Sequence, residues 1–185
     1  MKKNVTKLLM SLLILASINV IPSSIFGQKT IYLDTVDNIC KTGSIVNISI
    51  RAKNLSNIFS IGGSIRWDTA VMKYSSFIAG SNPAIRFAPT DIGTLSSAQG
   101  ILRFSYGDPN GLTGSVPDTT ALCSFLFTIK KVVVGHSALT FSSSPTTLEI
   151  DTADANGQNG DVYPTAKFIS SYVGFVSQPT ISKGA

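Results

Sequence analysis

The chain contains 185 residues and carries a formal charge of +5 at pH 7, from 15 Lys and Arg against 10 Asp and Glu. Lys2, Lys3 and Lys7 precede an apolar amino-terminal run, and without these three lysines the balance is 12 against 10. No basic run is longer than Lys130–Lys131, so the charge pattern excludes a nucleic-acid-binding surface of the usual kind.

The first 27 residues have the pattern of a secretory signal peptide. Three lysines are followed by the apolar run Leu8–Ile21 and then by Pro22–Gly27, which ends in a small residue. The run is too short to cross a bilayer comfortably, which disfavours the alternative of a permanent anchor. We therefore expect export, cleavage before Gln28, and a secreted or cell-surface protein without a membrane span in its mature part.

The remaining chain alternates short strand candidates with turns. Val, Ile, Phe, Thr and Tyr dominate the candidates, and no long amphipathic helix is visible. The predicted strands are Thr30–Thr35, Ser44–Ala52, Ser60–Trp67, Met72–Ile78, Gly100–Tyr106, Thr120–Lys130, Ala138–Ser142 and Lys167–Val176. Such a series predicts an all-β, antiparallel β-sandwich of the jelly-roll type, with about nine strands, over residues 28–176. The polar residues 177–185 are expected to form a flexible tail.

Two cysteines, Cys40 and Cys123, would enter an oxidising compartment after export. Cys123 shares the parity of Phe125 and Phe127, so its side chain is expected to point inward. A disulfide between Cys40 and Cys123 would close a long loop and stabilise the fold by about 4–5 kcal/mol in the chain-entropy model. Two separate buried thiols are the alternative, and the sequence does not choose between them.

Catalytic constellations are missing from the sequence pattern. The single histidine, His136, stands in a predicted turn, and no nucleophile-elbow motif accompanies it. Asp68 and Asp108 follow strands, where a pair of glycosidase carboxylates could converge, but turn formation is the commoner role of such residues. One His and two Cys also provide too few ligands for a structural zinc site. We expect that the protein is not an enzyme.

One segment collects the oxygen ligands that calcium prefers, namely Asp151, Asp154, Asn156 and Asp161. Its Asp-Ala-Asn-Gly portion is similar to part of a calcium loop, although no Glu closes an EF-hand spacing. A hairpin loop built on Asn-Gly explains the same residues without a metal. Calcium and a metal-free hairpin therefore both stand as expectations, and no other cofactor is expected.

Exposed aromatic rings would favour carbohydrate binding. The only tryptophan, Trp67, shares the parity of its apolar strand neighbours and is expected in the core. Phe87, Tyr163 and Tyr172 remain as surface candidates, but they are too scattered in sequence to define a sugar-binding strip.

Outward positions on three predicted strands form a mixed polar and apolar set. Thr120–Lys130 has leucines at outward positions where solvent would favour polar groups. The other two strands, Ser60–Trp67 and Gly100–Tyr106, each carry an outward arginine. If the three strands are neighbours, they make a flat face suited to protein recognition. The set consists of Ser64, Arg66, Arg103, Ser105, Leu122, Ser124 and Leu126. A loop or strand that covers Leu122 and Leu126 is the alternative.

The order of several motifs resembles that of a cohesin domain over Lys29–Val176. The motifs are G-S-I-V-N-I-S-I from Gly43, I-R-W-D from Ile65, G-I-L-R-F-S-Y from Gly100, A-L-C-S-F-L-F-T-I from Ala121 and V-G-F-V from Val173. The cysteines and the Gln-led mature terminus are more similar to the divergent cohesin-like domains of Bacteroidetes. The resemblance implies a jelly roll that binds a dockerin module through one sheet face, and the seven outward residues match the binding strands of the family.

The sequence therefore predicts a secreted, non-catalytic binding module whose partner is a dockerin-like or other surface protein. A carbohydrate-binding module on the same sandwich, with polysaccharide as its ligand, is the second hypothesis. A structural subunit of the cell surface or matrix, associating through an exposed edge strand, is the third.

Overall fold

The computed structural model describes residues 27–39, 41–153, 159–162 and 166–176. Apart from two short 3-10 helices, the regular elements in these ranges are all strands, which confirms the all-β prediction. Residues 1–26 of the predicted signal peptide and the whole predicted tail lie outside the described residues. No helix among the described residues is long and apolar enough to cross a membrane.

The strands β1 to β13 follow one another with short connections, and they outnumber the nine that the sequence predicts. The first six are β1 (Thr30–Leu33), β2 (Val36–Ile39), β3 (Ile45–Lys53), β4 (Ser56–Trp67), β5 (Met72–Ala79) and β6 (Ile92–Gly93). The others are β7 (Ile101–Ser115), β8 (Ala121–Ile129), β9 (Gly135–Ser142), β10 (Glu149–Ala153), β11 (Asn159–Val162), β12 (Lys167–Ile169) and β13 (Ser171–Phe175). The helices η2 (Pro89–Asp91) and η3 (Ser97–Gln99) lie on either side of β6.

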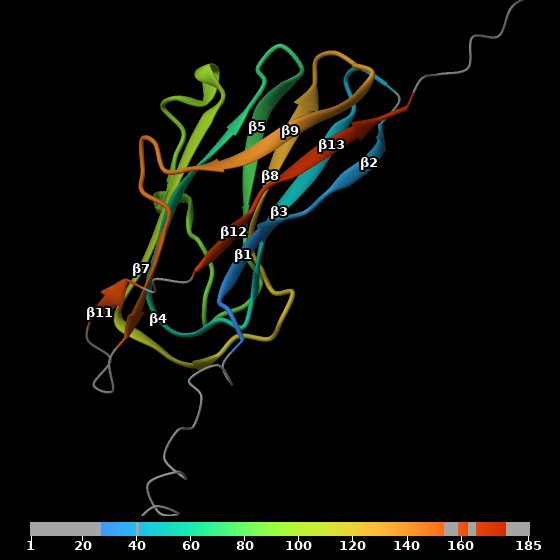
Figure 1. The fold of residues 1–185 in the computed structure, drawn as a ribbon. Coiled ribbons are helices and arrows are strands. Elements are labelled where there is room, and N and C mark those ends of the chain that lie inside the picture. Colours follow the sequence, from blue (N-terminus) through green and yellow to red (C-terminus); the bar gives the residue numbers. More distant parts are fainter. Residues whose placement is uncertain (1–26, 40, 154–158, 163–165, 177–185) are drawn as a thin grey trace, which may run out of the picture.

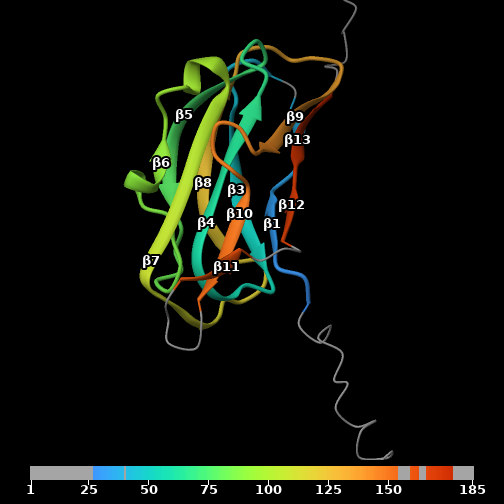
Figure 2. The same ribbon diagram turned by 60° about the vertical axis from the view of Figure 1, so that its left-hand side comes forward.

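Two sheets form the layers of a sandwich, as Figures 1 and 2 show from two directions. The five-stranded sheet has the order β12-β1-β3-β8-β5. The eight-stranded sheet has the order β11-β10-β4-β9-β13-β2, with β7 paired to β4 and β6 paired to β7. The predicted β-sandwich is therefore confirmed.

Both ends of the described chain cross from one sheet to the other, which the sequence pattern does not predict. The predicted strand Thr30–Thr35 corresponds to β1 in the five-stranded sheet, and the next strand, β2, lies in the eight-stranded sheet. The predicted strand Lys167–Val176 is two strands, with β12 in the five-stranded sheet and β13 in the eight-stranded sheet. β1 pairs with β12 and β2 with β13, both in parallel, so the sheets are mixed rather than purely antiparallel. Near the crossing, the hydroxyls of Thr35 and Ser171 share a hydrogen bond of 2.8 Å.

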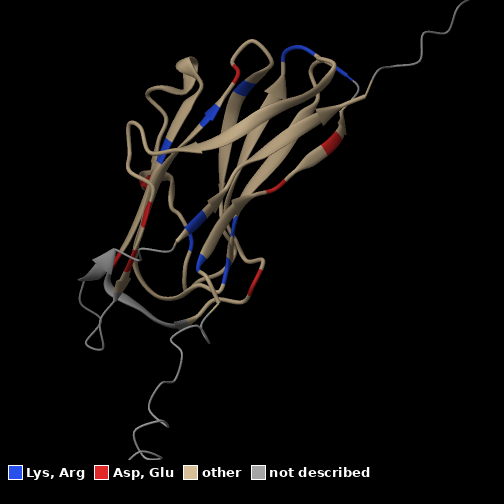
Figure 3. Ribbon diagram, viewed as in Figure 1, with Lys and Arg blue, Asp and Glu red and all other residues tan. Residues whose placement is uncertain are grey.

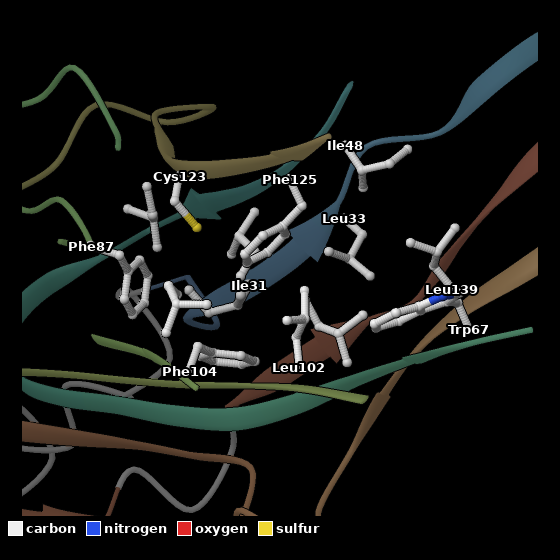
Figure 4. Packing of buried hydrophobic residues seen from close by; sticks show 14 of the residues in the cluster. Ile31, Leu33, Ile48, Trp67, Phe87, Leu102, Phe104, Cys123, Phe125 and Leu139 are labelled. Carbon is white, nitrogen blue, oxygen red and sulfur yellow. The ribbon is translucent and has the colours of Figure 1, made fainter. Parts of the chain in front are cut away.

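Buried apolar side chains from both sheets fill the core between them (Figure 4), and several aromatic rings of this core form edge-to-face pairs. Phe127 is fully buried, and its ring centroid lies 5.1 Å from that of Trp67. Trp67 is 7% exposed, as its parity predicts, and its indole N–H donates to the Met72 carbonyl at 3.1 Å. A second pair joins Phe87 to Phe104 across 5.9 Å. Such pairs contribute to stability beyond the apolar area that they bury.

Cys123 is a free, fully buried thiol, so the structure does not show the disulfide to Cys40 that the sequence leaves open as one of two alternatives. Burial raises the pKa of the Cys123 thiol, as is usual for an unreactive core cysteine. Cys40 itself lies outside the described residues.

Replacing Phe127 with alanine tests the aromatic core. The free energy of unfolding should fall by about 3–5 kcal/mol, because the buried contact with Trp67 is lost. Chemical denaturation followed by tryptophan fluorescence measures the change. Ile45→Ala is the control, since Ile45 is 65% exposed and its loss should change stability by less than about 0.5 kcal/mol. Equal effects of the two substitutions would contradict the described packing.

Candidate partner-binding face

The seven predicted face residues lie on two opposite sides of the sandwich. The eight-stranded sheet carries Ser64, Arg66, Arg103 and Ser105, on the directly paired strands β4 and β7. The five-stranded sheet carries Leu122, Ser124 and Leu126, on β8 between β3 and β5. The hypothesis that all three strands are neighbours is therefore wrong, because the chain changes sheet between β7 and β8. We call the two outward surfaces the β4–β7 face and the β8 face.

Two of the seven residues are buried and do not contribute to an exposed surface. Ser64 is 0% exposed, and its hydroxyl accepts a hydrogen bond from the Thr146 N–H at 3.1 Å. Leu122 is also 0% exposed, and the Phe87 N–H donates to its carbonyl at 3.1 Å. The connection after β5 therefore runs along this part of β8, which is the covering loop that the sequence leaves open. Leu126 is half-buried.

Arg66 and Arg103 form the charged centre of the β4–β7 face. In the register of the two strands, Ser64 lies opposite Arg103 and Arg66 lies opposite Ile101. The two arginines are therefore diagonal neighbours, about 7–8 Å apart between their backbone positions. Both side chains are half-buried, so their aliphatic stems cover sheet surface while the guanidinium groups face outward.

Hydrogen bonds fix the Arg66 guanidinium against the end of β9. Its Nε donates to the Ser142 hydroxyl at 3.1 Å, and its Nη2 donates to the Ser144 carbonyl at 3.0 Å. Arg103 has a different environment, because Gly93 of β6 lies opposite it in the sheet. A Cβ atom on Gly93 would lie 3.3 Å from the Arg103 Nε, so the glycine leaves room for the arginine stem to lie flat.

Acidic side chains occupy the far end of the same face. Glu149 pairs with Gly62 and Asp151 pairs with Ser60, and the Ser60 hydroxyl donates to the Asp151 carboxylate. Ser60 and Gly62 share the outward parity of Arg66 on β4. The β4–β7 face thus has carboxylates at one end and arginines nearer its centre, within an overall charge distribution that is scattered over the strands (Figure 3).

The β8 face is different in character because its centre is uncharged. Ile45 on β3 is 65% exposed and Ile78 on β5 is 45% exposed, with the half-buried Leu126 on the strand between them. The hydroxyls of Ser49 and Ser124 form a buried hydrogen bond of 2.9 Å across β3 and β8. This surface offers isolated apolar contacts and few groups that could orient a charged partner.

The metal and catalytic candidates do not come together in the described residues. Asp154 and Asn156 lie outside those residues, and for Asp161 only the backbone, in β11, is described. No group of three or more His, Cys, Asp or Glu side chains in the described ranges could hold a metal ion. Calcium at the Asp151 segment stays a prediction. His136 is exposed at the start of β9, with its ring centroid 5.2 Å from that of Tyr172.

Comparison with known proteins points to one family. The family model of the cohesin domain matches residues 30–167. The seventh ScaB type I cohesin from Pseudobacteroides cellulosolvens has a similar fold, with a TM-score of 0.65 at 12% identity, over 85% of this chain and 98% of that chain. A type I cohesin–dockerin complex from Clostridium thermocellum, Coh-OlpA-Doc918, gives 0.61 at 17% identity over 81% and 100%.

A third similar structure is the non-cellulosomal cohesin from the archaeon Archaeoglobus fulgidus. Its TM-score is 0.56 at 17% identity, over 83% of this chain and 94% of that chain. No curated protein matches the sequence.

Alanine substitution should separate the two arginines by their structural roles. Arg66→Ala removes two hydrogen bonds and should lower the free energy of unfolding by about 1–3 kcal/mol. Arg103→Ala should change it by less than about 0.5 kcal/mol, because its stem lies on an exposed surface beside Gly93. Denaturant titration of both variants measures the difference, and a larger loss for Arg103→Ala would contradict the described anchoring of Arg66.

Proposed function

This chain belongs to the cohesin family, and we propose that it is a non-catalytic module that binds a dockerin-like protein on its β4–β7 face. Two observations support a protein partner. The family model covers residues 30–167, and the solved structures of similar fold include cohesins in complex with dockerins.

The arginine pair is the observation that carries the choice of face. Arg66 and Arg103 are diagonal neighbours on a part of the sheet where β4 is paired on both sides, with β7 and with β9. Arg66 is pre-organised by its two hydrogen bonds, which reduces the entropy that binding would cost. Guanidinium groups bind carboxylates with directional geometry, so a partner with acidic groups opposite the pair fits this centre.

The charge distribution along the face would also orient the partner. Glu149 and Asp151 lie at the far end of the face from the arginines. A partner docked in the reverse direction would place its acidic groups against these carboxylates, which is unfavourable. Apolar contact is provided near the arginines by Ile101, which is half-buried, and by Leu95 after β6, which is 90% exposed. This mixture of apolar and charged groups is typical of non-obligate interfaces.

The carbohydrate-binding alternative lacks an aromatic strip on the described surface. Trp67 is 7% exposed and Phe87 is 0% exposed, so both belong to the core. Tyr172 is 41% exposed, and Tyr163 lies outside the described residues. One exposed ring gives little area for stacking on a polysaccharide, and we therefore place this function second.

Export is part of the proposal and depends on residues 1–27. Because these residues have the charge, apolar run and small-residue end of a signal peptide, the exported protein should begin at Gln28. Intact-mass measurement of protein recovered from the culture medium or cell surface checks this expectation. A product that retains the first 27 residues would contradict it.

Charge reversal tests the proposed face directly. A pull-down from the secreted fraction of the source organism identifies the partner, and calorimetric titration then measures its affinity. Arg103→Glu should weaken that affinity at least about tenfold, because it replaces attraction with repulsion at the centre of the interface. Lys73→Glu is the matched control, since Lys73 is exposed on β5 of the other sheet and should leave the affinity unchanged.

The opposite result would move the site to the other sheet. If Arg103→Glu leaves the affinity unchanged while Leu126→Asp on the β8 face lowers it, the choice of face is wrong. Circular dichroism of each variant confirms that the fold is retained, so that a loss of binding is not a loss of structure.

A further inference from the structure

β9 extends past the end of β4, so one edge of β9 lacks a partner strand over its first residues. The last pair between the two strands joins Trp67 to Leu139, whereas β9 begins at Gly135. On its other edge, β9 stays paired with β13 over this whole stretch. In the part of the chain that the structure describes, no strand occupies the β4 side of residues 135–138.

β4 stops at this point because the chain turns sharply after Trp67. The Asp68 carboxylate accepts the Ala70 N–H at 2.8 Å, and the Asp68 carbonyl accepts the Met72 N–H at 3.0 Å. The turn leads into β5, which belongs to the other sheet. The position that a longer β4 would fill beside β9 is therefore left open.

A hollow of about 480 Å³ lies at this position. Its lining combines the polar residues Arg66, Asp68, His136 and Thr140 with the buried apolar residues Trp67 and Val71. The open edge spans four residues, about 13 Å of extended chain. The hollow therefore has polar groups on its outward side, apolar groups on its inward side and a strand edge along its length.

Ser137 gives a second, independent indication of a ligand. It lines the hollow and is only 6% exposed, yet its hydroxyl has no hydrogen-bond partner among the described residues. A buried hydroxyl without a partner is unfavourable, and most buried polar groups in native proteins are satisfied. An occupant of the hollow that carries a hydrogen-bonding group at this depth would satisfy Ser137.

We propose that an extended segment of a partner protein pairs with the open edge of β9 and fills this hollow. Main-chain hydrogen bonds from a free strand edge are a recurring way of binding peptides, with specificity set by alternate side chains. The site goes beyond the proposed docking on the β4–β7 face, because it needs an extended segment at a strand edge. It is also separate from Arg103, which does not line the hollow.

The parity of β9 gives the side chains that the segment should carry. A residue opposite Ser137 would point inward, where a threonine could hydrogen-bond the serine hydroxyl and place its methyl group against Val71. The same kind of cross-strand pair already exists between Ser49 and Ser124 at 2.9 Å. The residues on either side would point outward, where an acidic side chain beside Arg66 is favoured and one beside Asp68, which also lines the hollow, is not. A segment with threonine between two acidic residues contains both the inward contact to Ser137 and the outward contact to Arg66.

The test is a nuclear magnetic resonance titration of the 15N-labelled full-length chain with the peptide Ac-Glu-Thr-Glu-Val-NH2. Saturable shifts should be confined to the amides of residues 133–138 and their strand neighbours. Two further peptides carry one N-methyl group each, on the threonine or on the glutamate after it. Because alternate N–H groups of a paired strand face the same neighbour, one of the two should bind at least about tenfold more weakly and the other should bind normally.

Ser137→Ala is the protein variant that separates binding from folding. It should weaken the peptide about fivefold, through the loss of one hydrogen bond, while the melting temperature is unchanged or higher because an unsatisfied buried hydroxyl is removed. Ser124→Ala, a buried serine of the other sheet, should leave peptide binding unchanged. Arg103→Glu should also leave it unchanged, so this site and the dockerin-like site can fail independently.

Several results would overturn the proposal. They are the absence of shifts at residues 135–138 with millimolar peptide, equal binding of both N-methylated peptides, or unchanged affinity of Ser137→Ala. Shifts of the same amides on deletion of residues 177–185, or on dilution without peptide, would instead assign the edge to the chain's own tail or to a second copy. Either assignment would also overturn it.

Discussion

The crossing of both chain ends between the two sheets is the constraint on which the rest of the structure depends. β1 and β12 close the five-stranded sheet, while β2 and β13, which follow them directly, join the eight-stranded sheet. The two parallel pairs tie the amino-terminal and carboxyl-terminal segments together in both layers, with Thr35 and Ser171 hydrogen-bonded near the crossing. Because each sheet then buries one face against the other, sheet membership decides which outward residues can act together.

This constraint places the β4–β7 face and the β8 face on opposite sides of the sandwich, although the sequence pattern suggests a single surface. β4 lies within its sheet, between β7 on one side and β9 and β10 on the other, so its outward residues share one side of the sheet, where Ser64 is covered and Arg66 is half-buried. Arg66 and Arg103 are diagonal neighbours because β4 pairs with β7. Hydrogen bonds to Ser142 and Ser144, at and just after the end of β9, hold the Arg66 guanidinium. The open edge of β9 also results from a change of sheet, because the chain leaves the eight-stranded sheet after Trp67 and enters the five-stranded sheet as β5.

Much of the fold could be predicted from the sequence, because inward and outward positions follow the period of two residues. Trp67, Phe125 and Phe127 are buried as their parity predicts. The same period does not say which sheet a strand joins, so the hypothesis of a single face across three neighbouring strands is wrong, because β8 lies in the opposite layer from β4 and β7. Leu122 has outward parity, and only the position of the chain after β5 explains its burial.

The same limit applies to the cysteines. Parity gives the inward direction of Cys123 correctly, but it does not choose between a disulfide and a free thiol, and the structure shows Cys123 as free. The local sequence pattern also does not predict the strand β10 or the full length of β7. β10 follows a segment that reads as loop, and β7 continues to Ser115 through residues with turn propensity, because pairing with β4 overrides local preference there.

The most direct test of the central claim is hydrogen–deuterium exchange of the protein with and without its partner. Binding on the β4–β7 face should slow exchange in residues 60–66 and 101–105, which carry or adjoin the two arginines, and should leave β3 and β8 unchanged. Slower exchange confined to residues 45–49 and 122–128 would place the partner on the β8 face and would contradict the account.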